Sequence, residues 1–83
     1  MYKILVRGKV AKQIQKISPP DFQRIHQAVN TLAQNPRPAG AKKLKGDTTI
    51  RIRVGDYRIL YEIDDENRVV IIYRVKHRRE VYR

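Results

Sequence analysis

The spacing of apolar residues differs between the two halves of the chain. In the first half they recur every three or four residues after a short strand over residues 2–7, which predicts two helices, each with one apolar face. From Thr48 the period falls to two, which predicts strands. The helical apolar positions are Val10, Ile14 and Ile17, followed by Phe22, Ile25, Val29 and Leu32.

Proline, glycine and small polar residues mark the ends of the second helix. Ser18 suits the N-cap, Pro19 the first helical position, and Asp21 the positive end of the helix dipole. A Pro- and Gly-containing segment over residues 35–40 ends the helix and leads into a basic loop. The lysines of this loop are Lys42, Lys43 and Lys45, with Leu44 between them.

The first two strands are predicted to form a hairpin with the two-residue turn Gly55 and Asp56. Val54 then pairs with Tyr57, and Arg53 lies opposite Arg58. Arg51 lies two residues further along on the same side of the sheet. The sequence therefore predicts a group of arginines on one face.

A third run over residues 69–75 follows a polar turn and is apolar at nearly every position, as in a central strand covered on both faces. A tight turn that pairs Tyr61 with Ile71 would place Arg58 opposite Arg74. The other face would then collect the core residues Ile50, Ile52, Val54, Tyr57, Ile59, Tyr61, Ile63, Val69, Ile71, Tyr73 and Val75.

The order strand, helix, helix, strand, strand, strand predicts an α+β fold. We expect a small, mainly antiparallel sheet with the two N-terminal helices packed on one face, in a single domain over residues 1–83. The sequence has no cysteine, which excludes disulfides and thiolate metal sites and fits a reducing cytoplasm. No signal peptide or membrane-spanning segment is expected, because no long apolar run occurs.

Charge gives the first functional indication. Nineteen Lys and Arg residues against eight Asp and Glu residues leave a formal net charge of +11, which attracts polyanions. Charge alone does not separate RNA, DNA and an acidic protein. The arginines have a structural alternative, in which they pair with Glu62 or lay their methylene groups over Leu60, Val70 and Ile72.

Three stretches of the sequence resemble the RelE toxins of toxin–antitoxin modules, within the RelE/ParE superfamily. They are the Lys-Leu-Lys-Gly stretch at 43–46, the hairpin Ile-Arg-Ile-Arg-Val-Gly-Asp-Tyr-Arg-Ile-Leu-Tyr at 50–61, and the end His-Arg-Arg-Glu-Val-Tyr at 77–82. The resemblance implies a cytoplasmic toxin that cleaves mRNA in the ribosomal A site without metal or cofactor. The ribose 2′-oxygen would attack the adjacent phosphorus, giving a 2′,3′-cyclic phosphate and a free 5′-hydroxyl.

The resemblance also implies roles for single residues. Arg58 matches the arginine that binds the scissile phosphate, Arg78 the arginine near the leaving group, and Tyr82 the tyrosine near the 2′-hydroxyl. Arg51 and Arg53 lie where relatives have lysines, and we expect them to stabilise charge rather than act as bases, because arginine keeps its proton. We expect the other basic residues to contact RNA and the ribosome: Lys42, Lys43, Lys45, Arg74 and Arg79.

His77 and Tyr82 are the titratable candidates for moving a proton. Histidine is the residue type that ordinarily titrates near neutrality, which makes His77 a candidate base, although it could instead stack on a nucleobase or lie on a solvated tail. Tyr82 could likewise stack on a base or pack against the sheet. His26, on the second helix, is expected to be a surface residue.

Two other functions fit the same sequence. One is a ParE-like inhibitor of DNA gyrase with no nuclease activity, and the other is an RNA-binding module that cleaves nothing. The resemblance to RelE toxins implies a RelB-like partner antitoxin in a toxin–antitoxin hetero-oligomer, and the net charge of +11 favours an acidic one. We expect its acidic segment to cover the arginine face or to displace the C-terminal end.

Overall fold

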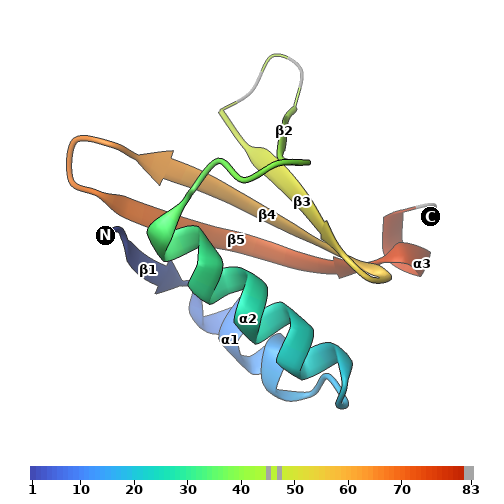
Figure 1. Ribbon diagram of the computed structural model, residues 1–83. Coiled ribbons are helices and arrows are strands. Elements are labelled where there is room, and N and C mark those ends of the chain that lie inside the picture. The colour runs from blue at the N-terminus through green and yellow to red at the C-terminus, as the bar shows by residue number, and fades with distance from the viewer. Residues whose placement is uncertain (45, 47, 82–83) are drawn as a thin grey trace.

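Three helices and five strands make up the chain over residues 1–44, 46 and 48–81, which the computed structural model describes (Figure 1). In chain order they are β1 (Lys3–Val6), α1 (Gly8–Gln15), α2 (Asp21–Gln34), β2 (Lys42–Lys43), β3 (Ile50–Val54), β4 (Tyr57–Asp64), β5 (Val69–His77) and α3 (Arg78–Val81).

The five strands form one sheet in the order β1-β5-β4-β3-β2. β1 runs parallel to β5, and the other neighbouring strands are antiparallel. Helices α1 and α2 lie together on one face of this sheet (Figure 1). The α+β fold, the helices on one face and the inner position of β5 are thereby confirmed.

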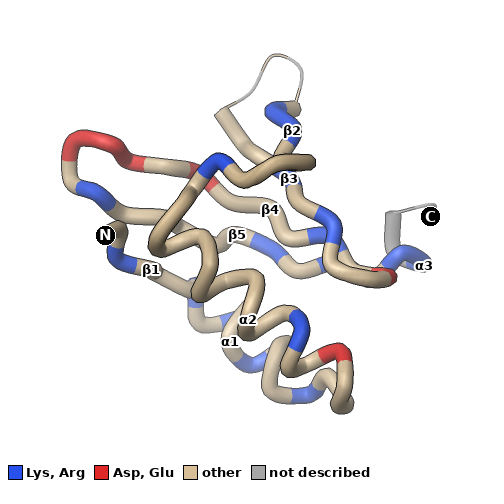
Figure 2. The backbone as a smooth tube through the Cα atoms, viewed as in Figure 1, with Lys and Arg blue, Asp and Glu red and all other residues tan. Residues whose placement is uncertain are grey.

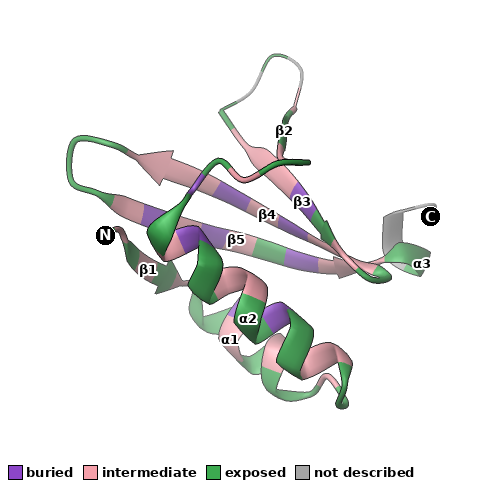
Figure 3. Cartoon of the chain, viewed as in Figure 1, coloured by how far each residue is buried: buried purple, intermediate pink, exposed green. Residues whose placement is uncertain are grey.

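The core lies between the helices and the sheet (Figure 3). Ile25 and Leu32 of α2 are fully buried, and α1 contributes Val10. Tyr61 is also fully buried, and its hydroxyl donates a hydrogen bond to the carbonyl oxygen of Pro36 at 2.7 Å. This bond satisfies the polar end of a side chain that is otherwise packed among apolar groups. The other buried sheet residues are Ile52, Ile59, Val70, Ile72 and Val75.

The hairpin of β3 and β4 has the predicted register. Val54 pairs with Tyr57 and Arg53 pairs with Arg58, with Gly55 and Asp56 between the strands. Gly55 has a φ of 59°, a left-handed conformation that a residue with a Cβ atom adopts only with strain. The glycine therefore fixes the tight turn on which the register depends.

The predicted pairing of β4 with β5 is wrong. A register shift at Leu60 and Tyr61 pairs Leu60 with Arg74 but Tyr61 with Ile72, so Arg58 faces Lys76 and not Arg74. Tyr73 is the extra residue of this bulge, and each residue before it changes face relative to the prediction. The core therefore takes Val70 and Ile72 in place of the expected Val69, Ile71 and Tyr73.

The start of α2 also differs from the prediction. The helix begins at Asp21 with Pro20 at the N-cap and without a side-chain cap, whereas Ser18 and Pro19 were expected there. Pro19 precedes another proline, and that position disfavours the helical conformation. Strand β2 lies where a loop was expected. None of the helices in the described ranges has the length and apolar character needed to cross a membrane.

Candidate nucleic-acid interface

The sheet face opposite α1 and α2 carries two rows of basic residues. One row runs across three strands as Arg53, Arg58 and Lys76. The second runs across four strands, with Leu60 between Arg51 and Arg74 and with Lys42 at its outer end. We call this set the cationic face: Lys42, Arg51, Arg53, Arg58, Arg74 and Lys76.

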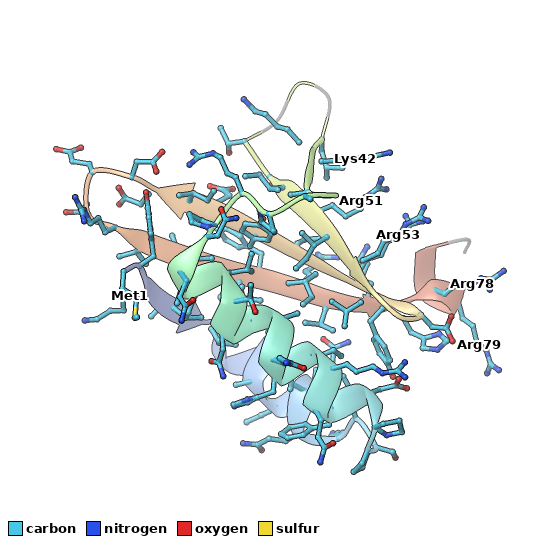
Figure 4. All side chains as sticks on the ribbon, in the orientation of Figure 1. Met1, Lys42, Arg51, Arg53, Arg78 and Arg79 are labelled. Carbon is cyan, nitrogen blue, oxygen red and sulfur yellow. The ribbon has the colours of Figure 1, made fainter. Side chains whose placement is uncertain are left out.

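Strand alternation explains why these side chains share a face. Ile52, Ile59 and Val75 each precede or follow a basic residue of the cationic face along a strand, and all three are buried under the helices. Successive side chains of a strand point to opposite sides, so burial of these three directs their neighbours outward. Figure 4 shows Lys42, Arg51 and Arg53 projecting away from the helices.

None of these basic residues forms an ion pair among the described residues, although Asp56 lies near Arg53 and Arg58 at the hairpin turn. Within the part of the chain that is described, the ion pair that the structure contains joins Arg37 to Asp65, away from the cationic face. Like charges directly opposite each other on neighbouring strands destabilise the pair, by up to about 1 kcal/mol. The face therefore has a net attraction for an anion that would relieve the repulsion.

A hollow of about 240 Å³ lies where the hairpin turn meets α3. It is lined by the basic residues Arg53, Arg58 and Arg78. The turn residues Gly55 and Asp56, the latter acidic, complete the lining. The backbone N–H of Arg78 donates to the carbonyl oxygen of Asp56 at 2.6 Å, which ties α3 to the turn. Three guanidinium groups thus surround one concave site, a geometry that suits the oxygens of a phosphate group.

His77 does not lie with the arginines. It pairs with Tyr57 across the strands, on the side of the sheet that the helices cover, and the two rings meet edge to face at 5.0 Å between centroids. Its Nδ1 accepts a hydrogen bond from the backbone N–H of Arg79 at 3.1 Å. This contact places His77 at the N-cap of α3, directly before Arg78.

Of the remaining predicted site residues, two are described, and neither belongs to the cationic face. Lys43 pairs with Ile50, so it lies on the other side of β2 from Lys42 and does not belong to the face. Arg79 is exposed on α3. Lys45 and Tyr82 lie outside the described residues. Within the described ranges, no three His, Asp or Glu side chains gather as metal ligands would.

Lys76 belongs to the cationic face but was not predicted there. It takes the position opposite Arg58 that the sequence assigned to Arg74. No signal in the sequence marks this position, because the run over residues 69–73 is apolar throughout and fits either register. Figure 2 shows basic segments side by side on β3, β4 and β5, and further ones on α3.

Comparisons with known proteins show which family the chain belongs to. A family model described as the ParE toxin of the type II toxin–antitoxin system parDE matches residues 4–82. A curated relative, a putative RelE1 toxin of Methanocaldococcus jannaschii, is 27% identical over 86 residues, which cover 99% of this chain and 96% of the relative.

Solved structures give the same result. The RelE–RelB complex of Pyrococcus horikoshii contains a chain with a TM-score of 0.84 and 26% identity, covering 93% of this chain and 94% of that one. The RelBE2 complex of Mycobacterium tuberculosis contains one with a TM-score of 0.79 and 29% identity, covering 92% and 96%. The resemblance seen in the sequence is confirmed, and this chain belongs to the RelE/ParE family of toxins of type II toxin–antitoxin systems.

Proposed function

We propose that this toxin is a metal-independent endoribonuclease that cleaves mRNA in the ribosomal A site and so inhibits translation. The observation that carries the proposal is the concave site formed by Arg53, Arg58 and Arg78, whose charges meet no internal partner among the described residues. A phosphate diester brings the missing negative charge to this site.

The chemistry requires no group outside the RNA and the protein. The ribose 2′-oxygen attacks the adjacent phosphorus while the bond from phosphorus to the 5′-oxygen breaks, leaving a 2′,3′-cyclic phosphate and a 5′-hydroxyl. Negative charge builds up on the non-bridging oxygens in the transition state. Arg53 and Arg58 stabilise that charge by donating hydrogen bonds from fixed positions, and Arg51 adds to the field from the neighbouring row.

In this proposal Arg78 stabilises the leaving 5′-oxygen by donating a hydrogen bond to it. Its backbone bond to Asp56 holds it at the rim of the hollow, and its side chain faces the same space as Arg53 and Arg58. The proton of the 2′-hydroxyl has to be taken by another group, since arginine stays protonated. His77 is directed to the other side of the sheet, which favours a positioning role for it, and Tyr82 remains the candidate for a direct contact with the 2′-hydroxyl.

The partner of this toxin is an antitoxin in our proposal. The relative from Pyrococcus horikoshii was solved in a RelE–RelB complex. The relative from Mycobacterium tuberculosis was solved in the toxin–antitoxin complex RelBE2. A chain of net charge +11 favours an acidic antitoxin segment on the cationic face. Lys42, Arg74, Lys76 and Arg79 are then available for contacts with RNA once the antitoxin has left.

The test is mRNA cleavage in a translating extract that contains purified toxin. We expect cuts within codons, mapped by primer extension, and no cuts when translation is blocked before initiation. Intact message at saturating toxin would contradict the proposal. Salt-sensitive binding of RNA without any product would instead identify a binding module.

A ParE-like inhibitor of DNA gyrase is the second candidate. It is favoured by the matching family model, which describes the ParE toxin. A supercoiling assay with purified gyrase separates the two functions. Inhibition of supercoiling by a toxin that leaves mRNA intact would establish this second function, whereas normal supercoiling together with cut mRNA would eliminate it.

A further inference from the structure

A second basic groove lies beside the cationic face, between β5 and α1. Its volume is about 510 Å³, twice that of the hollow between the arginines. Four basic side chains line it, together with one tyrosine: Arg7, Lys9, Tyr73, Arg74 and Lys76. No acidic residue is among the described residues of its lining.

The groove exists because β1 is shorter than β5. β1 pairs with β5 only as far as Val6 and Ile72, after which the chain turns away into α1. From Tyr73 onward β5 therefore has one strand neighbour, β4, among the described residues. The side-chain amide of Gln13 donates to the carbonyl oxygen of Val75 and closes the bottom of the space.

Tyr73 gives the groove an aromatic wall. The guanidinium carbon of Arg7 lies 5.6 Å from the centre of the Tyr73 ring, which is the geometry of a cation–π contact. Tyr73 is the extra residue of the bulge in β5, and its side chain is half-buried rather than packed in the core. Basic groups that follow a backbone, combined with an aromatic ring, are typical of sites for single-stranded nucleic acid.

The groove is continuous with the proposed phosphate site. Arg74 and Lys76 belong to both, and Lys76 lies directly opposite Arg58. Two strand spacings, about 10 Å, separate Arg53 from Lys76 across the sheet. A strand bound at Arg53 and Arg58 can therefore extend over Lys76 into the groove, whose described lining contains no acidic residue.

We propose that this groove binds the sugar–phosphate backbone of single-stranded RNA flanking the scissile phosphate, with Tyr73 stacking on one base. The proposal rests on the proposed function only in that the same strand occupies the arginine site. An acidic protein segment would also respond to the charge, but it has no need of an aromatic ring set among the cations. RNA uses both features.

Binding of oligonucleotides of two lengths to the free toxin tests this proposal. The probes are a 2′-O-methyl trinucleotide, which fills the arginine site alone, and a 2′-O-methyl nonanucleotide of related sequence. Neither is cleaved, because the 2′-hydroxyl is blocked. The wild-type toxin should bind the longer probe more tightly, and its affinity for that probe should depend more steeply on salt.

Replacing two basic residues of the groove should remove this difference. For Arg7→Ala with Lys9→Ala, we expect about tenfold weaker binding of the nonanucleotide. The logarithmic salt slope should fall by about 1.4, at about 0.7 for each phosphate contact on a single strand. The matched control is Lys12→Ala with Lys16→Ala, which removes the same charge from exposed positions of α1 and its C-cap outside the groove. It should change neither quantity.

Two further variants guard against misfolding and separate stacking from charge. Lys9→Glu changes an exposed side chain with no part in the Arg7–Tyr73 contact, and it should weaken the nonanucleotide alone. Tyr73→Leu should weaken it about tenfold without changing the salt slope. Circular dichroism confirms the fold of each variant.

The possible outcomes distinguish this proposal from the proposed function. Equal affinity of wild-type toxin for both probes, unchanged by the groove substitutions, overturns the groove but leaves the arginine site intact. A toxin that binds neither probe overturns the groove, whereas the proposed function is decided by cleavage in the translating extract. Groove variants that bind RNA normally but lose affinity for the antitoxin would assign the groove to the protein partner and overturn the RNA assignment.

Discussion

The two basic residues of β3 on the cationic face are arginines, Arg51 and Arg53. Arg51 and Arg53 contribute a charge that stays constant with pH and a planar group that can hold two phosphate oxygens at once. They stand beside Arg58, which has Arg53 on one side and Lys76 on the other. At the scale of single residues, the site stores electrostatic repulsion that a phosphate relieves.

Arg58 should therefore weaken the fold while serving the reaction. Arg58→Gln keeps much of the apolar stem but removes the charge between Arg53 and Lys76. We expect mRNA cleavage to fall by at least about 100-fold, as for loss of one transition-state hydrogen-bond donor. The free energy of unfolding in urea should rise by about 1 kcal/mol, since two like-charge contacts disappear.

Lys16→Gln is the matched control, because Lys16 is exposed at the C-cap of α1, away from the cationic face. It should alter neither cleavage nor stability appreciably. A fully active Arg58→Gln toxin would refute the assignment of Arg58 to the scissile phosphate.

Two substitutions at His77 separate a positioning role from proton transfer. The His77 ring accepts the N–H of Arg79 and so caps α3, the helix that carries Arg78. Asparagine is a good N-cap and alanine a poor one. We expect His77→Asn to retain cleavage within about tenfold of wild type and His77→Ala to lose more.

The pH profile of cleavage gives a second readout for His77. A general base contributes about 100-fold to 10,000-fold, so both variants would lose that much if His77 took the proton. In that case the acid limb of the profile would also disappear in both. Retained activity and an unchanged profile in His77→Asn support the cap.

At the scale of elements, the hairpin could be predicted from the sequence and the pairing of β5 could not. Gly55 and Asp56 mark a turn between two alternating runs, so one register satisfies both the turn and the burial of Ile52 and Ile59. Residues 69–73, the first part of β5, are apolar at every position, and such a segment can shift by one residue without exposing more apolar surface. The bulge at Tyr73 therefore left no trace in the apolar pattern.

The same limits explain which site residues were found. Arg53 and Arg58 follow from the hairpin alone, whereas Lys76 depends on the bulge. The side chain of His77 lies on the opposite face of the sheet from the arginines. His77 pairs with Tyr57, which packs against the core on the helix side. Strand β2 has only two residues, too few for any period to show.

A side chain at position 55 should destabilise the hairpin turn. Gly55→Ala places a Cβ atom at a φ of 59°, although the space around it is open apart from Arg24. The cost is about 1 kcal/mol in the free energy of unfolding, from backbone strain alone. Gly8→Ala is the control, because its Cβ atom meets nothing within 4 Å and it starts a helix. That variant should be neutral or slightly more stable in a urea titration.

A cluster of Tyr2, Arg37 and Asp65 joins the segment before β1, the loop after α2 and the turn between β4 and β5. Arg37 donates two hydrogen bonds to Asp65, at 2.8 and 3.3 Å, and the Tyr2 hydroxyl donates one at 2.6 Å. The bonds from Arg37, followed by that from Tyr2, lower the pKa of the Asp65 carboxyl to about 2. The folded state therefore holds the ionised carboxylate more strongly than the unfolded chain does.

This cluster gives the stability a defined pH dependence. Because the folded pKa is depressed, its contribution is complete above the unfolded value near 4 and is lost as the pH falls toward about 2. Asp65→Asn should lower the urea midpoint at pH 7, and the difference from wild type should vanish near pH 2. Glu66→Gln, in the same exposed turn, is the control. A difference that persisted at pH 2 would contradict the ionic origin.

At the scale of the whole molecule, charge is separated along the sheet. The acidic turn between β4 and β5 lies at one end, and the cationic face, α3 and the basic groove lie toward the other (Figure 2). A net charge of +11 arranged in this way orients the toxin as it approaches a polyanion. Composition alone predicted attraction to a polyanion. The sheet register shows which end of the molecule carries the basic residues and would face the polyanion.

The proposed function is tested most directly by a message whose A-site codon carries a single 2′-deoxynucleotide at the position that supplies the nucleophile. Purified ribosomes are programmed with this message or with its all-ribose counterpart, and wild-type toxin is added. We predict cleavage of the all-ribose message alone, with a 2′,3′-cyclic phosphate at the new end, and no cleavage by Arg58→Gln. Equal cleavage of both messages, or of neither, would contradict the account.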